Sequence, residues 1–249
     1  MIPHRRELRT CPVDGGTVLI NSVLRATPVA APAPAPRGEG WHPHDPPWVG
    51  IEGDTRVELA PAVVRDGLGA HEVIHGGLES ALALAAERIA DLRQDRRLRG
   101  FHVAGRADGG VTDRLELVAL PFDHARSAPA LWRDREIGGP RCLCVERDAV
   151  AILAWAPRTP MEVWVLPRHG RPAFGRDGGA VARLAAHALE RLARALPGVG
   201  VDLVLVDGEP WRLELRPRLV THGAFTLATG VPAHGSFPED ATAWLHDFC

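Results

Sequence analysis

Arg114-Leu115-Glu116-Leu117 and Arg212-Leu213-Glu214-Leu215 are the same tetrapeptide, and the order of the segments before it is repeated as well. Each copy follows an apolar strand-like segment, a long amphipathic segment, a second apolar stretch and a turn. These segments are 71–74, 78–98, 101–104 and 108–110 in the first succession, and 161–164, 181–196, 203–206 and 207–208 in the second. Two copies of a strand, helix and hairpin unit predict a duplicated α+β fold.

The two amphipathic segments predict two helices that pack on a sheet. In 78–98 the apolar residues recur at helical spacing and the charged residues fall elsewhere. The segment 181–196 has the same pattern and stops at Pro197-Gly198, a dipeptide that ends helices. We therefore expect both helices to lie on the sheet with their charged side chains in water.

Length and composition place the protein among globular proteins. With 249 residues, 45% of them hydrophobic, the chain can bury one good core or two small fused cores. A net charge of -2 provides no field that would attract nucleic acid or an anionic membrane. No apolar run approaches the roughly 20 residues of a membrane span. We expect no nucleic-acid partner and no membrane association.

The compartment is predicted from the first residues and from the cysteines. The first thirty residues lack the apolar leader of a secreted protein. Four cysteines at irregular spacing are too few for a disulfide framework, which agrees with a reducing compartment. We therefore expect a cytoplasmic protein. All basic residues are Arg, and this indicates a high-GC genome of the actinobacterial kind.

A Pro/Ala-rich segment is expected to divide the chain. It contains Ala31-Pro32-Ala33-Pro34-Ala35-Pro36, a composition that favours an extended connector and fills neither a helix nor an inner strand. We predict an N-terminal strand segment at 1–27, the connector at 28–48, a first half at 49–135 and a second half at 136–249.

Several further motifs follow one another along nearly the whole chain. They are Arg6-Glu7-Leu8-Arg9, Gly69-Ala70-His71-Glu72-Val73-Ile74, Val118-Ala119-Leu120-Pro121, the run from Pro160 to Pro167, and the run from Trp211 to Leu219. In this order they resemble the galactose-1-phosphate uridylyltransferase-like family of the histidine-triad superfamily. The resemblance implies two fused histidine-triad-like halves around one antiparallel sheet with packed helices, usually assembled as a homodimer.

The catalytic histidine of that family is replaced by Arg114. Family members carry His-Pro-His just before the stretch that is Leu115 to Pro121 here, and the second histidine attacks the α-phosphate to form a nucleotidyl-histidine. This chain has Thr112-Asp113-Arg114 at those positions. A guanidinium stays protonated and has no free lone pair, so Arg114 cannot be that nucleophile.

The metal ligands of the family are replaced too. The family pattern His-x-His-x-Glu has become Pro210-Trp211-Arg212-Leu213-Glu214, in which only the glutamate remains. A Cys-x-x-Cys pair expected after the first strand is replaced by the connector. We therefore predict no zinc and no other cofactor.

Arginine in place of histidine still suits an anion. On a strand, Arg114 and Glu116 point to one face, and so do Arg212 and Glu214. We predict that the two arginines bind the phosphate or carboxylate of a small ligand, and that Asp113, Glu116 and Glu214 are candidates for acid/base catalysis. The alternative is that each arginine pairs with a neighbouring carboxylate across the sheet and binds nothing.

Two histidine patterns compete with this interpretation. His71-Glu72-Val73-Ile74-His75 fits the zinc metalloprotease pattern, which requires a helix so that both histidines reach one metal. Its β-branched residues and glycine neighbours predict a strand, on which the two histidines lie about 13 Å apart. The metalloprotease is therefore a minor alternative. His42-Pro43-His44 copies the lost triplet but lies in the connector, where histidines are usually solvated.

Two classes of function stay open. One is an enzyme repurposed, for example in specialised metabolism, to bind a phosphorylated, nucleotide-bearing or carboxylated small molecule. The other is a catalytically silent binding or scaffold protein that pairs with itself or with a homologue. The sequence assigns no role to His42, His44, His71 or His75.

Overall fold

The structure is a computed structural model that describes eleven stretches of the chain. They are residues 5–12, 15–22, 27–28, 50–52, 55–59, 70–122, 131–169, 174–175, 178–206, 211–220 and 223–248. The expected connector lies outside them, apart from Pro28, and so do His42, His44 and the turn at 207–208.

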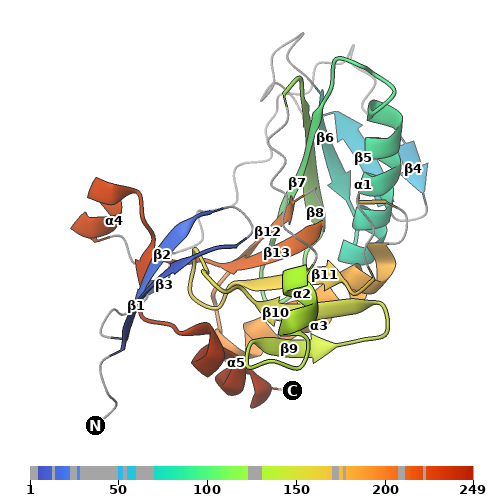
Figure 1. The fold of residues 1–249 in the computed structure, drawn as a ribbon. Helices are drawn as coiled ribbons and strands as arrows, with labels where there is room; N and C mark the ends of the chain where they lie inside the picture. The colour runs from blue at the N-terminus through green and yellow to red at the C-terminus, as the bar shows by residue number, and fades with distance from the viewer. Residues whose placement is uncertain are drawn as a thin grey trace.

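Ten of the described strands form one antiparallel sheet (Figure 1). Their order is β4-β5-β6-β8-β7-β12-β13-β11-β10-β9, and every neighbouring pair is antiparallel. The strands are β4 Gly50–Glu52, β5 Thr55–Leu59, β6 Ala70–His75, β7 Gly100–Ala107, β8 Arg114–Leu120, β9 Cys142–Val145, β10 Ala149–Leu153, β11 Val163–Pro167, β12 Val201–Val206 and β13 Arg212–Pro217.

The sheet contains two halves with the same succession of elements. The first runs β6, α1 (Leu78–Leu92), β7 and β8, and the second runs β11, α3 (Gly179–Ala195), β12 and β13. β7 and β12 pair at the centre, with Ala104 opposite Val204. Outward from this pair the order is β8, β6, β5 on one side and β13, β11, β10 on the other. The predicted duplicated α+β fold is confirmed.

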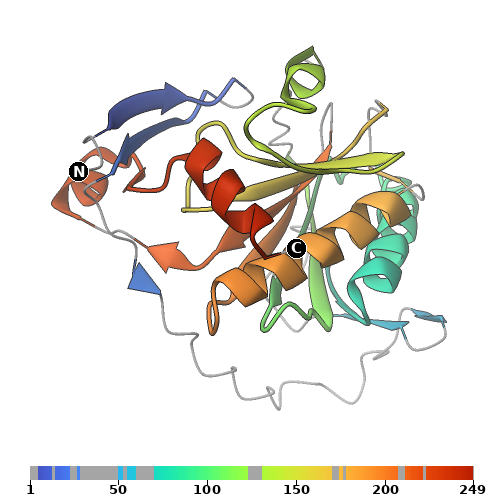
Figure 2. The ribbon, with the colours of Figure 1, turned by 90° about the horizontal axis from the view of Figure 1, so that it is seen from below.

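The helices α1 and α3 contact each other and cover one face of the sheet (Figure 2). Their apolar residues join those of the strands in one core, as the amphipathic patterns predicted. The prediction for the end of α1 was wrong, because the helix ends at Leu92 and not at residue 98. Beyond it the chain forms tight turns, and Asp95 accepts hydrogen bonds from the backbone and guanidinium of Arg97. Such local hydrogen bonds compete with helix continuation.

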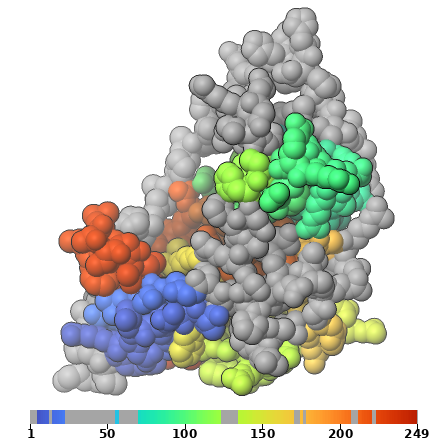
Figure 3. All heavy atoms as spheres, turned by 45° about the horizontal axis from the view of Figure 1, so that its top comes forward, coloured from blue at the N-terminus to red at the C-terminus, as the bar shows by residue number. Residues whose placement is uncertain are grey.

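The remaining elements pack mainly around the second half. β1 (Arg6–Thr10) and β2 (Thr17–Asn21) form a hairpin that β15 (Ala233–His234) extends, while β3 (Thr27–Pro28) pairs with β14 (Leu219–Val220). The further helices are α2 Leu131–Glu136, α4 Ala224–Thr229 and α5 Pro238–His246. α4 lies beside the N-terminal strands, away from the first half (Figure 3). Among the described residues, no helix has the length and hydrophobicity of a membrane span.

A buried ion pair fixes α1 to the sheet. Glu72 of β6 points to the helix side, where Arg88 Nε and Nη2 donate to its two oxygens at 2.9 and 2.6 Å. The Glu72 side chain is 2% exposed. Its charge therefore depends on Arg88 for compensation, and the hydrogen bonds to Glu72 raise the pKa of Arg88 further above its ordinary value.

Arg88→Met should lower the free energy of unfolding by about 3 to 5 kcal/mol, because it leaves Glu72 buried and unpaired. The matched control is Arg183→Met, which breaks the Arg183–Glu79 pair between α3 and α1, where both side chains are more than half exposed. That change should cost less than about 1 kcal/mol. Urea denaturation measures both. Equal effects would mean that the Glu72–Arg88 pair contributes no more than a surface pair.

Candidate functional site

The strand registers put three polar side chains together on the face of the first half that points away from α1. We call this the open face. Val73 of β6 lies opposite Glu116 of β8, so His71, two residues earlier on β6, shares the face with Arg114 and Glu116. Leu115, between the last two, is buried on the helix side. The alternation predicted for this tetrapeptide is therefore present.

Arg114, Glu116 and His71 form a line from solvent into the sheet. Arg114 Nη2 donates to Glu116 Oε1 at 2.5 Å, and these side chains are 53% and 41% exposed. Glu116 Oε2 lies 3.5 Å from Nε2 of His71, whose side chain is 6% exposed. One carboxylate thus connects an accessible guanidinium to a buried imidazole from the neighbouring strand.

The equivalent side chains of the second half are buried. Arg212 and Glu214 are each 1% exposed, and Arg212 Nε and Nη2 donate to Glu214 Oε1 at 2.7 and 2.6 Å. The guanidinium carbon of Arg212 lies 4.3 Å from the ring centre of Trp164, which is the residue opposite Glu214 on β11. The other oxygen of Glu214 accepts a hydrogen bond from Arg216. Arg212 is therefore closed to solvent.

Glu162 occupies the second-half position that corresponds to His71, two residues before the partner of the repeat glutamate. It is buried and accepts hydrogen bonds from the backbone N–H of Arg158 at 2.6 Å and from Trp164 Nε1 at 2.8 Å. Burial, and then the charge of Glu214, raise the pKa of Glu162 above the ordinary value of a carboxyl. The second half thus carries two carboxylates where the first has a carboxylate and an imidazole.

The N-terminal hairpin closes the second half. Val18 and Ile20 of β2 belong to a second apolar core together with Ile152 and Trp164. The hairpin lies on the side of the sheet away from α3 (Figure 2). Trp164 of this core lies against Arg212. The second polar pair is buried, whereas the first is exposed.

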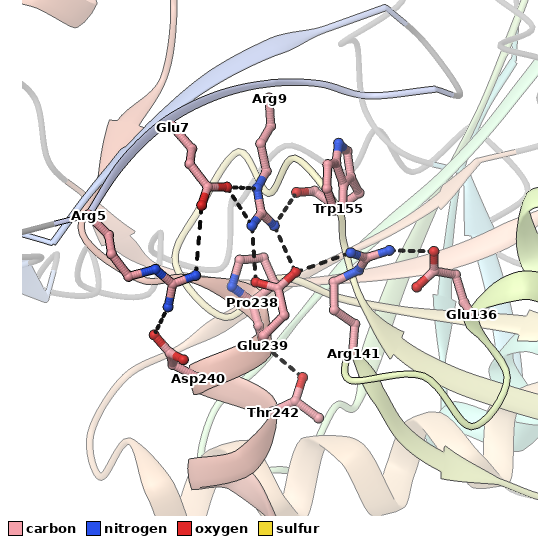
Figure 4. A network of polar contacts seen from close by, with 10 residues as sticks. All are labelled: Arg5, Glu7, Arg9, Glu136, Arg141, Trp155, Pro238, Glu239, Asp240 and Thr242. Carbon is pink, nitrogen blue, oxygen red and sulfur yellow. Dashed lines mark hydrogen bonds and ion pairs between the residues drawn. The ribbon is translucent and has the colours of Figure 1, made fainter. Parts of the chain in front are cut away.

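A network of charged side chains holds the hairpin in place (Figure 4). Arg9 of β1 donates to Glu239 at the start of α5, with Nη1 at 3.0 Å from Oε1, and to Glu7 with Nε at 2.9 Å. Arg141 donates to the same Glu239 oxygen at 3.1 Å. The guanidinium carbons of Arg9 and Arg141 lie 4.2 and 4.4 Å from the ring centre of Trp155. These contacts join the hairpin, α5 and the sheet.

The five predicted site residues fall into separate groups. Arg114 lies beside Glu116, and Arg212 lies beside Glu214, each within one strand rather than across the sheet. Three strand spacings, or about 14 Å, separate the two pairs. Asp113 is exposed just before β8. His71 was not assigned to the site, because its place beside Glu116 depends on the pairing of β6 with β8, which the motif alone does not give.

The geometry argues against metal at His71 and His75 and at Arg212. His71 and His75 belong to strand β6, as predicted, and Glu72 points to the opposite face, so the helix that the metalloprotease pattern requires is absent. At the second-half position where the resemblance implies a metal ligand lies the buried guanidinium of Arg212, which repels a cation. Within the described residues, no three metal-binding side chains gather.

Comparisons with known proteins identify the fold. No protein-family model and no curated protein matches the sequence. Among solved structures, a GalT-like protein from Arabidopsis thaliana matches with a TM-score of 0.70 and 18% identity, over 98% of this chain and 99% of that chain. An ADP-glucose phosphorylase from the same plant, with bound ADP-glucose, matches with a TM-score of 0.71 and 17% identity, over 98% of each chain. A uridylyltransferase matches with a TM-score of 0.62 and 15% identity, also over 98% of each chain.

The TM-scores establish the fold. The low sequence identities leave the activity to be argued from the site. The chain has the fold of the galactose-1-phosphate uridylyltransferase-like proteins, so the resemblance inferred from the ordered motifs is confirmed at the level of structure.

The raised pKa of Glu162 predicts a stability difference that changes with pH. A folded-state pKa above the unfolded value adds stability at low pH, and this contribution is lost as pH rises from about 4.5. Glu162→Gln keeps an acceptor oxygen and cannot ionise. We expect wild type to lose stability relative to this variant as pH rises, measured by urea denaturation between about pH 4 and 8.

Glu239 is the control, because its pKa is shifted in the opposite direction. Burial acts to raise its pKa, but hydrogen bonds from Arg9 and Arg141 outweigh burial and lower it. Wild type should therefore gain stability relative to Glu239→Gln as pH rises through the acidic range. If the difference in unfolding free energy between wild type and variant changed with pH in the same direction for both variants, this account of the buried carboxyls would be wrong.

Proposed function

We propose that this protein binds a small phosphorylated or carboxylated molecule, nucleotide-bearing ligands included, on the open face, and that it acts on this molecule without a nucleotidyl-histidine. The observation that carries the proposal is the accessible guanidinium of Arg114, at the position where the resemblance places the family's nucleophile. A planar guanidinium matches the oxygens of phosphate and carboxylate.

The neighbours of Arg114 support an anionic ligand. His75 lies opposite Arg114 in the ladder of β6 and β8, and Arg56 lies opposite His75 in the ladder of β5 and β6. Three residues that can carry positive charge thus occupy one row on adjacent strands, about 4.8 Å apart. The exposed Arg114–Glu116 pair contributes only about 0 to 1 kcal/mol, so an incoming anion can take the place of Glu116 at Arg114.

A protein of the same fold supports the class of ligand. The ADP-glucose phosphorylase contains bound ADP-glucose, a phosphorylated nucleotide sugar. We infer that the chain has kept an anion-binding place of this fold and has exchanged the imidazole of the nucleophile for a guanidinium that binds and does not attack.

The assembly follows from the same resemblance, and the location from the four irregularly spaced cysteines. We propose a cytoplasmic homodimer. We propose no nucleic-acid or membrane partner, since a net charge of -2 attracts neither nucleic acid nor an anionic membrane. The alternative is a silent scaffold protein that pairs with itself or a homologue. The Arg212–Glu214 pair favours that alternative for the second half, because Glu214 is already satisfied by two arginines of the chain itself.

Arg114→Leu should change ligand binding, and Arg212→Leu should change stability. A charge-assisted contact contributes about 1.5 to 3 kcal/mol, so Arg114→Leu should weaken binding about tenfold to a hundredfold with the melting temperature unchanged. Arg212→Leu leaves Glu214 with one partner fewer and should lower the melting temperature by several degrees. Calorimetric titration with ADP-glucose, UDP-glucose and pyrophosphate, together with thermal scans, measures both.

The same data separate binding from scaffolding. If both variants lower the melting temperature and neither changes the binding of any of the three probes, the arginines are structural ion-pair partners, and the scaffold protein replaces the ligand-binding protein.

No nucleotidyl-enzyme intermediate should form. After incubation with UDP-glucose labelled at the α-phosphate, the denatured protein should carry no label, because residue 114 has no nucleophilic nitrogen. Acid-labile label on any histidine, including His42 and His44 of the connector, would show that another imidazole has taken over the transfer.

A further inference from the structure

We infer that Glu116, with His71 behind it, makes the open face a hydrolytic site, where water attacks the bound phosphoryl group directly. The inference rests on the proposed function, because it needs a phosphorylated ligand at Arg114. It assigns a reaction to that ligand, namely a single displacement by water in place of transfer through a covalent histidine.

The two oxygens of Glu116 have different surroundings. Oε1 accepts the hydrogen bond of Arg114, while Oε2 lies 3.5 Å from His71 Nε2 and belongs to a side chain that is 41% exposed. A ligand phosphoryl group held by Arg114 is therefore next to a carboxylate that water can reach. A carboxylate in this position can accept a proton from an attacking water molecule.

His71 can take the proton further. Its ring lies inside the sheet beside Glu116, and neither ring nitrogen forms a hydrogen bond with the described residues. Val118 lies opposite His71 on β8, so the imidazole has an apolar neighbour on that side. A neutral imidazole keeps one nitrogen with a free lone pair, and this makes His71 a proton acceptor behind the carboxylate.

The step balances as follows. The oxygen of water forms a bond to phosphorus, and one proton of the water passes to Glu116 Oε2 and from there to His71 Nε2. The bond from phosphorus to the leaving oxygen breaks, and its electron pair leaves with that oxygen, which takes a proton from solvent. The guanidinium of Arg114 stabilises the negative charge on the phosphoryl oxygens in the transition state. The products are a phosphate and the free alcohol, phenol or second phosphate.

The second half cannot carry out this step. Both oxygens of Glu214 accept hydrogen bonds from arginines, and its side chain is closed to water. Glu162 stands where the first half has His71. The protein therefore contains an equivalent carboxylate without access, and hydrolysis is assigned to the first half alone.

The test uses the 4-nitrophenyl ester of uridine 5′-monophosphate in water enriched in oxygen-18. We expect release of nitrophenol and one oxygen-18 atom in each uridine monophosphate, counted by mass spectrometry. Glu116→Gln should lower kcat by about a hundredfold to ten-thousandfold, while uridine monophosphate binds at least as tightly, because the carboxylate that competes for Arg114 is no longer charged. Glu190→Gln, on the exposed side of α3, is the control and should retain full kcat.

A separate variant tests whether His71 acts through Glu116 as a positioning and proton-accepting residue. His71→Gly should lower kcat, and free imidazole should restore a measurable part of it, because the buried space left by the ring can hold an imidazole. The melting temperature with and without imidazole is recorded alongside. Restored kcat without a change in melting temperature supports the role, whereas a restored melting temperature without restored kcat makes His71 structural.

The inference is overturned if the ester is not hydrolysed above the buffer rate, if no oxygen-18 enters the product, or if Glu116→Gln retains full kcat. These results differ from a failure of the proposed function. Binding of the probes that Arg114→Leu weakens, without hydrolysis, removes the reaction and keeps the anion site. Absence of binding by any probe removes both.

Discussion

The antiparallel ladder between β7 and β12 is the contact on which the rest of the structure depends. It joins two strand, helix and hairpin units into one sheet, with Ala104 opposite Val204 at the centre. Because the units meet through equivalent strands, both helices lie on the same face, and both copies of the repeated tetrapeptide point their arginine and glutamate to the other. The halves then differ in the residues that they carry on that second face, such as Glu162 in the position of His71, and in how far these are buried.

The N-terminal hairpin of β1 and β2 packs on the second half. The hairpin packs on Trp164 and its neighbours, and Arg9 and Arg141 hold it to α5 through Glu239. Burial of charge is costly unless the charge is paired, which explains the tight contacts of Arg212 with Glu214. On the first half the same pair is solvent-exposed, where an ion pair is weak and exchangeable. One repeated motif thus forms a buried ion pair in one half and an exposed ion pair in the other.

Much of the fold could be predicted, and less of the site. Hydrophobic periodicity located α1 and α3, and the β-branched residues of β6 indicated a strand despite a metalloprotease pattern. The end of α1 was misplaced because side-chain hydrogen bonds around Asp95 ended the helix. His71 could not be assigned to the site. Its sequence pattern predicts a strand, but it does not predict that this strand pairs with β8 and brings His71 beside Glu116.

The sequence by itself determined the duplication, the strand and helix order, and the arginine at position 114, because these depend on residue identity and on local periodicity. Only the tertiary structure decided that Arg114 is accessible and Arg212 is closed, because both have the same local sequence, Arg-Leu-Glu-Leu, and the same strand geometry. Arg212 lies against Trp164, whose apolar core includes Val18 and Ile20 of the N-terminal hairpin, far away in the chain. Burial is a property of packing between distant segments, and a local pattern carries no information about it.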